Sequence, residues 1–496
     1  MAVEPQPALT AAQDEAEAAF ATWLAAPADG SPFVLRGYAG TGKTFLAMRL
    51  LALADAAGLC WTVVAPTHKA VGVLRQQLER VGLRPTWYPS TIHRLLRLKL
   101  RRERELERCE ATEQTAQALE HLGLVLVDEA SMIDSELLEI SLRCAHPYRC
   151  RLVFVGDPAQ LPPVGESSSP VFDLSRCRGA ELTAVVRHGG PVLRLAAGLR
   201  GGALPCCRPP VLPPLRQPAG QVAILERRDW LRAAQEALRR CAGTDNPDLV
   251  RILCYTNRSL EELVPMARRA LHGAMADQLA VLPGEVLITR SAVLAPACRE
   301  GEAGGEEPDM VLGSNRELLV QDVAPERCDL ADFGVGHDDG LSAPVIETLQ
   351  ATVEAGQGRL RLRLLPPIGS PQRLALDTVL QQLRQQARAA GRQGGRPLWR
   401  RFFLVRDAFA SLGPAAVLTV HRSQGSTFSE VFVDGDVFRP ADPVLRRQLV
   451  YVAVTRASQA VALVAGSASV ADQECWRRWL DAGALEAHDL REQPAG

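Results

Sequence analysis

Short, largely apolar runs alternate with amphipathic segments through the first part of the chain. The runs lie at 33–35, 60–65, 124–127 and 151–155. Their length and composition predict buried strands, and the segments between them have the spacing and alanine content of helices. One such helix is expected over 9–25, with Thr10 as its N-cap. Buried strands that alternate with helices predict an α/β fold on a mainly parallel sheet.

The alternation returns in the second half of the chain and is interrupted there by a different pattern. Strands expected at 222–225 and 251–255 are each followed by a segment with helical spacing, and the strand expected at 415–420 leads into HRSQGSTFSEVFV, with a helix expected after it at 446–458. Between them, residues 281–366 carry short β-like pieces separated by polar loops, which predicts a small antiparallel barrel or sheet. Residues 374–411 then predict two helices joined by GRQGGRP.

These patterns divide the chain into two α/β domains, the second of which carries an insertion. The first domain is expected over 1–200 and includes a charged, pin-like insertion at about 97–121, which is helix-prone but has almost no apolar face. A stretch rich in proline and glycine near 201–220 predicts a linker. The other expected boundaries are 201–284 and 413–485 for the two parts of the second domain, 285–412 for the inserted barrel and helical projection, and 486–496 for a tail.

Composition narrows the class of protein. The chain has 496 residues and is 47% apolar, but it has no apolar run long enough to span a bilayer and no signal-peptide layout at its start. We therefore expect a cytoplasmic protein without membrane contact. A net charge of −1 provides no global field for a nucleic acid, so any such binding needs a local groove. The cysteines show no metal-ligand spacing, which favours reduced thiols.

The sequence GYAGTGKT at 37–44 is the most specific chemical signal. It follows the expected strand 33–35 and leads into an expected helix, which is the context of the phosphate-binding loop G-x-x-x-x-G-K-[ST]. Its glycines let backbone N–H groups turn toward a phosphate, and the helix N-terminus adds a positive dipole end. Lys43 is expected to reach the β- and γ-phosphates, and Thr44 to ligate Mg²⁺.

Acidic, amide and basic side chains follow the later strands of the first domain. Asp128 and Glu129 stand at the end of 124–127, in the Walker B layout, where Asp128 would hold Mg²⁺ and Glu129 would polarise the attacking water. Gln160, in the loop GDPAQLPPVG, is a candidate for sensing the γ-phosphate. Arg187 is a candidate phosphate clamp, although a lone arginine is more often a surface residue.

Polar residues also occupy junctions where strands or loops give way to helices. Ligands of open α/β folds bind at this edge of the sheet. Taken singly, each of these residues is more often an N-cap or a satisfied histidine than a binding residue. They are Thr67, His68, Thr91 and His93.

The ordered motifs resemble those of superfamily 1 helicases of the B branch, which includes RecD-like and Dda-like enzymes. They are GYAGTGKT, APTHKA, STIHRLL, LVDEASM, GDPAQLPPVG, LTAVVR, VLTVHRSQGSTF and LVYVAVTRA, and they span essentially the whole chain. The resemblance implies two RecA-like P-loop NTPase domains in tandem, with a small Src-homology-3-like β-barrel and helices inserted in the second. It also implies ATP and Mg²⁺ as cofactors.

The resemblance assigns a role to each matching residue. Gln13 corresponds to an adenine-reading glutamine, and Glu129 to the catalytic base. The residues implied to hold the triphosphate and its Mg²⁺ are Gly40, Thr41, Gly42, Lys43, Thr44, Asp128 and, near the nucleotide, Gly425. Those implied to sense or neutralise the γ-phosphate are Gln160, Arg187 and Arg456, the last from the second domain. Those implied to hold a single-stranded backbone are Thr67, His68, Lys69, Thr91, His93, Thr419, His421 and Ser423.

The implied function is an ATP-dependent DNA helicase or translocase that moves 5′ to 3′ on single-stranded DNA and at its junctions with duplex. The expected setting is a monomer in the cytoplasm of a bacterial or phage-infected cell, acting in replication, repair or recombination beside single-strand binding protein. Two alternatives remain open, an RNA-directed helicase and a nucleotide-gated binding module. Residues 99–121 contain no aromatic side chain, so translocation is better supported than efficient duplex splitting.

Overall fold

The computed structural model describes residues 9–103, 106–183, 190–201, 208–244, 246, 248–294, 310–336, 341, 343–355, 358–467 and 469–480. The chain forms two compact units. The first unit is made of segments 1–99, 111–263 and 417–496, and the second of segments 100–110 and 264–416. Within the described part of the chain, no helix has both the length and the apolar character needed to cross a membrane.

Six parallel strands form the first sheet of the first unit, in the order β3-β2-β6-β7-β1-β8. They are β1 (Phe33–Gly37), β2 (Trp61–Ala65), β3 (Ser90–Thr91), β6 (Leu124–Val127), β7 (Arg151–Gly156) and β8 (Arg178–Leu182). The associated helices are α1 (Ala11–Ala25), α2 (Lys43–Ala56), α3 (His68–Val81), α4 (Ile92–Leu95), α5 (Glu113–Ala116) and α6 (Ser135–Ala145), with the short turns η1 (Ala130–Met132), η2 (His146–Tyr148) and η3 (Pro170–Asp173).

This sheet is buried on both faces, as its apolar runs predict. Phe33 and Leu35 of β1 pack in a core with α1, α2 and α3. Val34, between them, packs in a separate core with α4 and α6. Because successive side chains of a strand point to opposite faces, both sides of the sheet are covered by helices. The expected start of α1 is confirmed, since Thr10 and Gln13 form a reciprocal capping box.

A second six-stranded sheet lies in the same unit, in the order β19-β11-β20-β21-β10-β9. Its strands are β9 (Leu212–Gln217), β10 (Gly220–Leu225), β11 (Val250–Cys254), β19 (Val417–Thr419), β20 (Phe428–Val433) and β21 (Ala457–Val464). Its helices are α7 (Pro191–Gly201), α8 (Arg227–Cys241), α9 (Asn257–His272), α13 (Pro443–Thr455) and α14 (Val470–Leu480), with the turns η5 (His421–Ser423) and η6 (Gly435–Phe438). The predicted pair of α/β folds in tandem is therefore confirmed.

One segment of this sheet departs from the sequence prediction. The proline-rich stretch near 201–220, expected to be a linker, includes strand β9, which pairs antiparallel with β10 at the edge of the sheet. Proline lacks a backbone N–H group. An edge strand needs that group only at the positions that pair with its single neighbouring strand, so proline is compatible with an edge strand. Pro213 and Pro214 are both exposed. The proline content of this segment predicted a linker, and for that reason the strand was not expected.

The second unit contains the predicted antiparallel sheet, in the order β17-β16-β15-β12-β18. Its strands are β12 (Val286–Thr289), β15 (Glu317–Asp329), β16 (Val345–Ala355), β17 (Gly358–Arg363) and β18 (Leu412–Pro414), beside the two-stranded ribbon of β13 (Val293–Leu294) and β14 (Met310–Leu312). Its helices are α10 (Met275–Gln278), α11 (Pro371–Ala389) and α12 (Gly391–Asp407), with the turn η4 (Leu330–Phe333).

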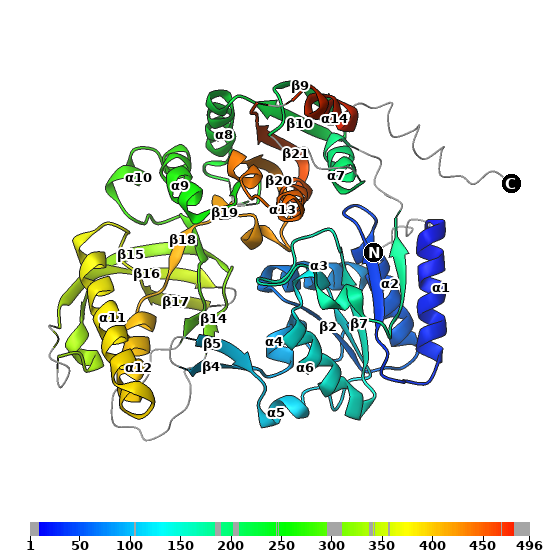
Figure 1. Ribbon diagram of the computed structural model, residues 1–496, viewed down its shortest axis with the longest axis horizontal. Coiled ribbons are helices and arrows are strands. Elements are labelled where there is room, and N and C mark those ends of the chain that lie inside the picture. The colour runs from blue at the N-terminus through cyan, green and yellow to red at the C-terminus, as the bar shows by residue number, and fades with distance from the viewer. Residues whose placement is uncertain are drawn as a thin grey trace. The chain divides into compact units, whose positions relative to one another are not determined.

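Helices α11 and α12 form the predicted pair and lie side by side (Figure 1). Phe402, Phe403 and Trp399 of α12 share a core with Leu376 and Leu383 of α11. The expected joining loop GRQGGRP is helical instead, because α12 already begins at Gly391. The packed aromatic face outweighs the low helix propensity of glycine.

The charged segment near 97–121, predicted to be a pin-like insertion, contains two paired strands, β4 (Lys99–Glu103) and β5 (Leu106–Glu110), instead of the helix that its composition favours. A helix without an apolar face has little packing to stabilise it in water. Two short paired strands satisfy many of the backbone hydrogen-bonding groups without needing an apolar face. Strand pairing is therefore favoured here over the helix that the residue propensities suggest.

Candidate nucleotide and nucleic-acid site

The phosphate loop joins β1 to α2 and has the geometry that its sequence predicts. Gly40 and Gly42 adopt φ values of 83° and 80°, in the left-handed region that favours glycine. An added Cβ at Gly37 would lie 2.8 Å from Thr41 Oγ1 and 2.9 Å from Lys43 Cγ. Lys43 Nζ donates to the Tyr38 carbonyl at 2.9 Å. The loop is therefore a tight cradle with an ammonium folded over it at a helix N-terminus.

Asp128 and Glu129 follow β6, at the same edge of the sheet as the phosphate loop. Desolvation by the surrounding protein, together with the neighbouring Glu129 carboxylate, raises the pKa of Asp128 to about 7. Glu129 has a φ of 55°, a conformation rare for a residue with a side chain and often associated with functional sites. A desolvated carboxyl beside a second acid suits a divalent cation, which would favour its ionised form. The donor set therefore fits the predicted Mg²⁺.

Two of the predicted site residues each have a buried polar atom with no hydrogen-bond partner among the described residues. These atoms are Oε1 of Gln160, in the loop after β7, and Nε of Arg456, at the end of α13. Nη1 of Arg456 donates to the Ser426 carbonyl at 3.0 Å. Buried polar atoms are seldom left unpaired without a reason. A bound triphosphate and an attacking water would supply an acceptor for Arg456 and a donor for Gln160, so these residues fit the expected ligand.

The second sheet of this unit contacts the phosphate loop directly. The hydroxyl of Tyr451, in α13, accepts a hydrogen bond from the Ala39 N–H at 3.0 Å and donates to Asp157 Oδ2 at 2.7 Å. The guanidinium of Arg200, in α7, lies 3.8 Å from the ring centroid of Tyr38. Two consecutive loop residues thus contact helices of the other sheet. The sequence pattern did not single out Tyr451, Asp157 or Arg200, although Tyr451 belongs to the motif that contains Arg456.

A further buried contact joins two motif loops of this unit. Gln424, next to the predicted Gly425, donates through Nε2 to the Leu161 carbonyl at 3.1 Å. Gly425 has a φ of 71°, and an added Cβ there would lie 3.1 Å from Ala70 Cβ and 3.2 Å from Thr67 Oγ1. Gly425 is therefore a point of close approach between the sheets, which the motif alone did not reveal.

Gln13, one of the predicted nucleotide contacts, lies beneath the phosphate loop. Gln13 is 1% exposed, and its Nε2 donates to the Thr41 carbonyl at 3.0 Å, so it supports the phosphate loop from α1. Whether it also reads a base stays a prediction. Arg187 lies outside the described residues.

The residues predicted to hold a nucleic-acid backbone occupy helix starts and turns. Thr67 caps α3 and Thr91 caps α4 through their hydroxyls. Lys69 Nζ forms an ion pair with Asp248 Oδ1 at 2.8 Å, and His68 lies beside it at the start of α3. Thr419 ends β19 and is buried. Their role in binding nucleic acid stays a prediction.

Two of the three histidines of this set, His93 and His421, are half-buried and have a shifted pKa. Burial lowers the pKa of His93, against an opposing effect of Asp134, and burial also lowers the pKa of His421. Each ring is therefore neutral near pH 7 and offers a phosphate an N–H donor rather than a charge. Ser423 is fully buried, and its hydroxyl donates to the Val420 carbonyl at 2.8 Å, so in this structure it supports the turn and offers no exposed donor.

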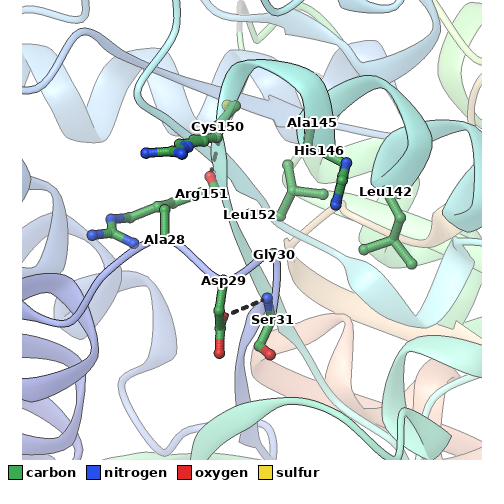
Figure 2. Close-up of a pocket in the computed structure, with 11 residues that line it drawn as sticks. Ala28, Asp29, Gly30, Ser31, Leu142, Ala145, His146, Cys150, Arg151 and Leu152 are labelled. Atoms are coloured by element: carbon green, nitrogen blue, oxygen red, sulfur yellow. Dashed lines mark hydrogen bonds between the residues drawn. The ribbon is translucent and has the colours of Figure 1, made fainter.

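A cavity of about 270 Å³ lies at the opposite edge of the first sheet. Figure 2 shows its walls, which include residues 28–31 before β1, His146 of η2, and Arg151 at the start of β7. Ligands of parallel α/β sheets bind at the carboxyl ends of the strands. Because this cavity lies at the amino ends, it is separate from the nucleotide site.

The fold and the site together define a P-loop NTPase with two RecA-like sheets in one unit. Comparison with protein families agrees with this class. Residues 9–204 match the family described as AAA domain, and residues 414–464 match the UvrD-like helicase C-terminal domain.

Two known relatives show which P-loop NTPases the chain is similar to. The chain is 24% identical over 432 residues to the ATP-dependent DNA helicase dda of Enterobacteria phage T4, covering 85% of this chain and 92% of that protein. It is 33% identical over 177 residues to the ATP-dependent RecD2 DNA helicase of Deinococcus radiodurans, covering 35% of this chain and 22% of that protein. In sequence, the chain is thus similar to the Dda-like and RecD-like proteins of the B branch of superfamily 1 helicases.

A solved structure of the Pif1 helicase from Bacteroides, in complex with ADP-AlF3 and ssDNA, covers 99% of both chains. It has 14% sequence identity and a TM-score of 0.45. So distant a likeness adds nothing to the assignment of function.

Proposed function

We propose that this chain is an ATP-dependent DNA helicase that moves 5′ to 3′ along single-stranded DNA. The observation that supports it most directly is the contact of Tyr451 with Ala39, because it brings helix α13, which leads into Arg456, to the phosphate loop. A nucleotide on that loop would therefore lie between two sheets, and its hydrolysis would change how they approach each other. The Dda relative, which is named a DNA helicase, aligns along most of the chain.

Each site residue has a defined task in this proposal. Lys43 neutralises phosphate charge, while Thr44 and Asp128 hold Mg²⁺, which supplies further neutralisation of the triphosphate when bound. Glu129 accepts the proton of the attacking water, which Gln160 orients. The Arg456 guanidinium stabilises the charge that develops in the transition state, and such an arginine is worth about 10³-fold or more in rate.

The nucleic acid is proposed to lie along the helix starts and turns of the same unit. Thr67, Thr91 and Thr419 offer hydroxyl groups or backbone near this path, and Lys69 offers the charge. Phosphate contacts of this kind hold any sequence, which suits a translocating protein. The proposed strand separator is the hairpin of β4 and β5, and it carries no aromatic wedge.

The remaining parts of the proposal concern organisation and setting. We propose the domain boundaries given by the sequence pattern, with the second-unit sheet as a Src-homology-3-like barrel. We also propose that the protein acts as a monomer in the cytoplasm, at junctions of single- and double-stranded DNA coated by single-strand binding protein.

The test has two parts. ATP hydrolysis should rise steeply with single-stranded DNA and should fall by two orders of magnitude or more, roughly, in Lys43→Ala or Glu129→Gln. Displacement of streptavidin from each end of a biotinylated oligonucleotide should occur only at the 3′ end. Hydrolysis indifferent to DNA would favour a nucleotide-gated binding module. Stronger stimulation by a matched ribo-oligonucleotide at the same salt concentration would favour an RNA-directed helicase.

A further inference from the structure

The Tyr451 hydroxyl makes two hydrogen bonds that its ring does not need for packing. The side chain is 2% exposed, and the hydroxyl lies between the Ala39 N–H at 3.0 Å and Asp157 Oδ2 at 2.7 Å. A buried hydroxyl is unfavourable unless it is hydrogen-bonded. A phenylalanine would fill the same volume without that requirement. The hydroxyl therefore points to a task beyond filling the core.

Asp157 links this hydroxyl to the loop that carries Gln160. The residue is fully buried, and its Oδ1 accepts the Ala159 N–H at 3.0 Å. Its carbonyl accepts the Gln160 N–H at 3.1 Å. The Asp157 carboxylate thus orders the turn that presents Gln160 and, through its other oxygen, contacts Tyr451.

Helix α13 links the same hydroxyl to Arg456. Tyr451 and Arg456 are five residues apart, which corresponds to about 7.5 Å of rise along a helix. The Arg456 N–H still donates to the Val452 carbonyl, at 3.2 Å, so the helical hydrogen bonding continues to the arginine. A displacement of Tyr451 is therefore transmitted to Arg456 through one rigid element.

We propose that Tyr451 is a positioning residue that couples the phosphate loop, the Gln160 loop and Arg456 through its hydroxyl group. The inference rests on the proposed ATPase and assigns a new residue to that site. Ala39 supplies the anchor on the nucleotide side, Asp157 the anchor on the Gln160 side, and α13 the connection to Arg456. Stacking of Arg200 on Tyr38 holds the neighbouring loop residue from α7.

The decisive variant is Tyr451→Phe, which keeps the ring and removes both hydrogen bonds. In the nucleotide-free protein, amide hydrogen exchange at Ala39 should become about tenfold faster, the change expected for a lost hydrogen bond of ordinary net strength. In the DNA-stimulated reaction, kcat should fall about tenfold while KM for ATP changes less than about twofold, because the interaction acts on transition-state groups. Tyr148→Phe, in η2 at the opposite edge of the sheet, is the matched control.

A double variant separates coupling from a local packing defect. If Tyr451 acts through Arg456, Tyr451→Phe should lower kcat little further in an Arg456→Ala background, since the two residues form one unit. Asp157→Asn, which keeps the shape but removes the charge, should show a smaller loss of kcat in the same direction. The Asp157→Asn variant also tests the proposal if Tyr451→Phe does not fold.

The outcomes are distinguishable. Unchanged Ala39 exchange, or fully independent losses in the double variant, would overturn the role of Tyr451 while leaving the helicase proposal intact. Absence of DNA-stimulated hydrolysis in the unaltered protein would instead remove the proposed function itself, and with it the positioning role.

Discussion

Lys69 and Asp248 form an ion pair, with Nζ 2.8 Å from Oδ1, between the start of α3 on the first sheet and the segment before β11 on the second. Lys69 Nζ also lies 5.0 Å from the ring centroid of Phe428. Lys69 is one of the residues proposed to bind a nucleic-acid phosphate. The Asp248 carboxylate would therefore compete with a nucleic-acid phosphate for the same ammonium group.

Removing that carboxylate should strengthen binding to single-stranded DNA. Both side chains keep some exposure, 22% and 39%, and such pairs are worth about 0–1 kcal/mol. Asp248→Asn should therefore raise the affinity for an oligothymidylate by up to about fivefold at low salt. The gain should shrink as salt screens the charges. Fluorescence anisotropy over a salt series measures both effects.

The matched control for this variant is Asp229→Asn on α8, which removes one negative charge from an exposed pair with Arg232. An equal gain in both variants would indicate a general effect of net charge. A weaker affinity in Asp248→Asn would show that Asp248 orients Lys69 for binding rather than competing for it.

The sequence predicted most of the elements because its strands are nearly continuous apolar runs. Thr10, Lys43 and Asp128 stand where their motifs place them, since the loop after a buried strand leaves few alternatives for a G-x-x-x-x-G-K-T segment. The hairpin of β4 and β5 and the edge strand β9 were missed for a common reason. Both are stabilised by backbone pairing with a neighbouring strand, which leaves no hydrophobic periodicity to detect.

The contacts between the two sheets could not be predicted from the sequence, for a different reason. Tyr451 reaches Ala39 across 412 positions, and Lys69 reaches Asp248 across 179. No local pattern encodes such pairs, because each partner also satisfies an ordinary local role, such as a core tyrosine or a surface acid. The motifs indicated which loops carry chemistry, and only the fold shows which side chains join them.

Gly425 should tolerate a side chain poorly, for two separable reasons. Its φ of 71° strains any other residue, and an added Cβ would meet Ala70 and Thr67 at 3.1 and 3.2 Å. Gly425→Ala should lower the free energy of unfolding by about 1–3 kcal/mol. It should also lower DNA-stimulated ATPase activity, because the two sheets approach each other at this point. Urea unfolding and steady-state hydrolysis measure the two effects.

Gly82, at the end of α3, provides the matched control. Its φ of 73° is nearly the same, but an added Cβ there meets nothing within 4 Å. Gly82→Ala should therefore lose stability without losing ATPase activity. Equal activity losses in both variants would mean that backbone strain alone, and not the close approach, accounts for the effect at Gly425.

Asp128 should make the stability of the nucleotide-free protein depend on pH. Its pKa is raised from 3.8 to about 7 in the folded state, so the folded protein binds more protons than the unfolded chain between these values. The free energy of unfolding should therefore fall as pH rises from 4 to 7 and then level off. The shift corresponds to at most about 4 kcal/mol.

Asp128→Asn removes this titration, so without Mg²⁺ the variant should be more stable than the unaltered protein at pH 8 and similar to it near pH 4. Urea unfolding in EDTA across this range measures the difference. Added Mg²⁺ should stabilise the unaltered protein at pH 8 and leave the variant nearly unchanged. A difference between the two proteins that does not vary with pH would contradict the raised pKa.

The hairpin of β4 and β5 should be needed for separating strands but not for moving along one. It forms its own two-stranded sheet, so its removal need not disturb the first sheet. Replacing Leu100–Glu110 with a short glycine linker should preserve DNA-stimulated hydrolysis and streptavidin displacement within about twofold, since β4 and β5 belong to neither of the two sheets that carry the nucleotide-site residues. Unwinding of a forked duplex with a 5′ tail, followed by fluorescence of a released strand, should fall at least about tenfold.

Two other outcomes would contradict this role of the hairpin. Unwinding at the unaltered rate would show that another element divides the strands. Loss of streptavidin displacement together with unwinding would show that the hairpin takes part in translocation itself.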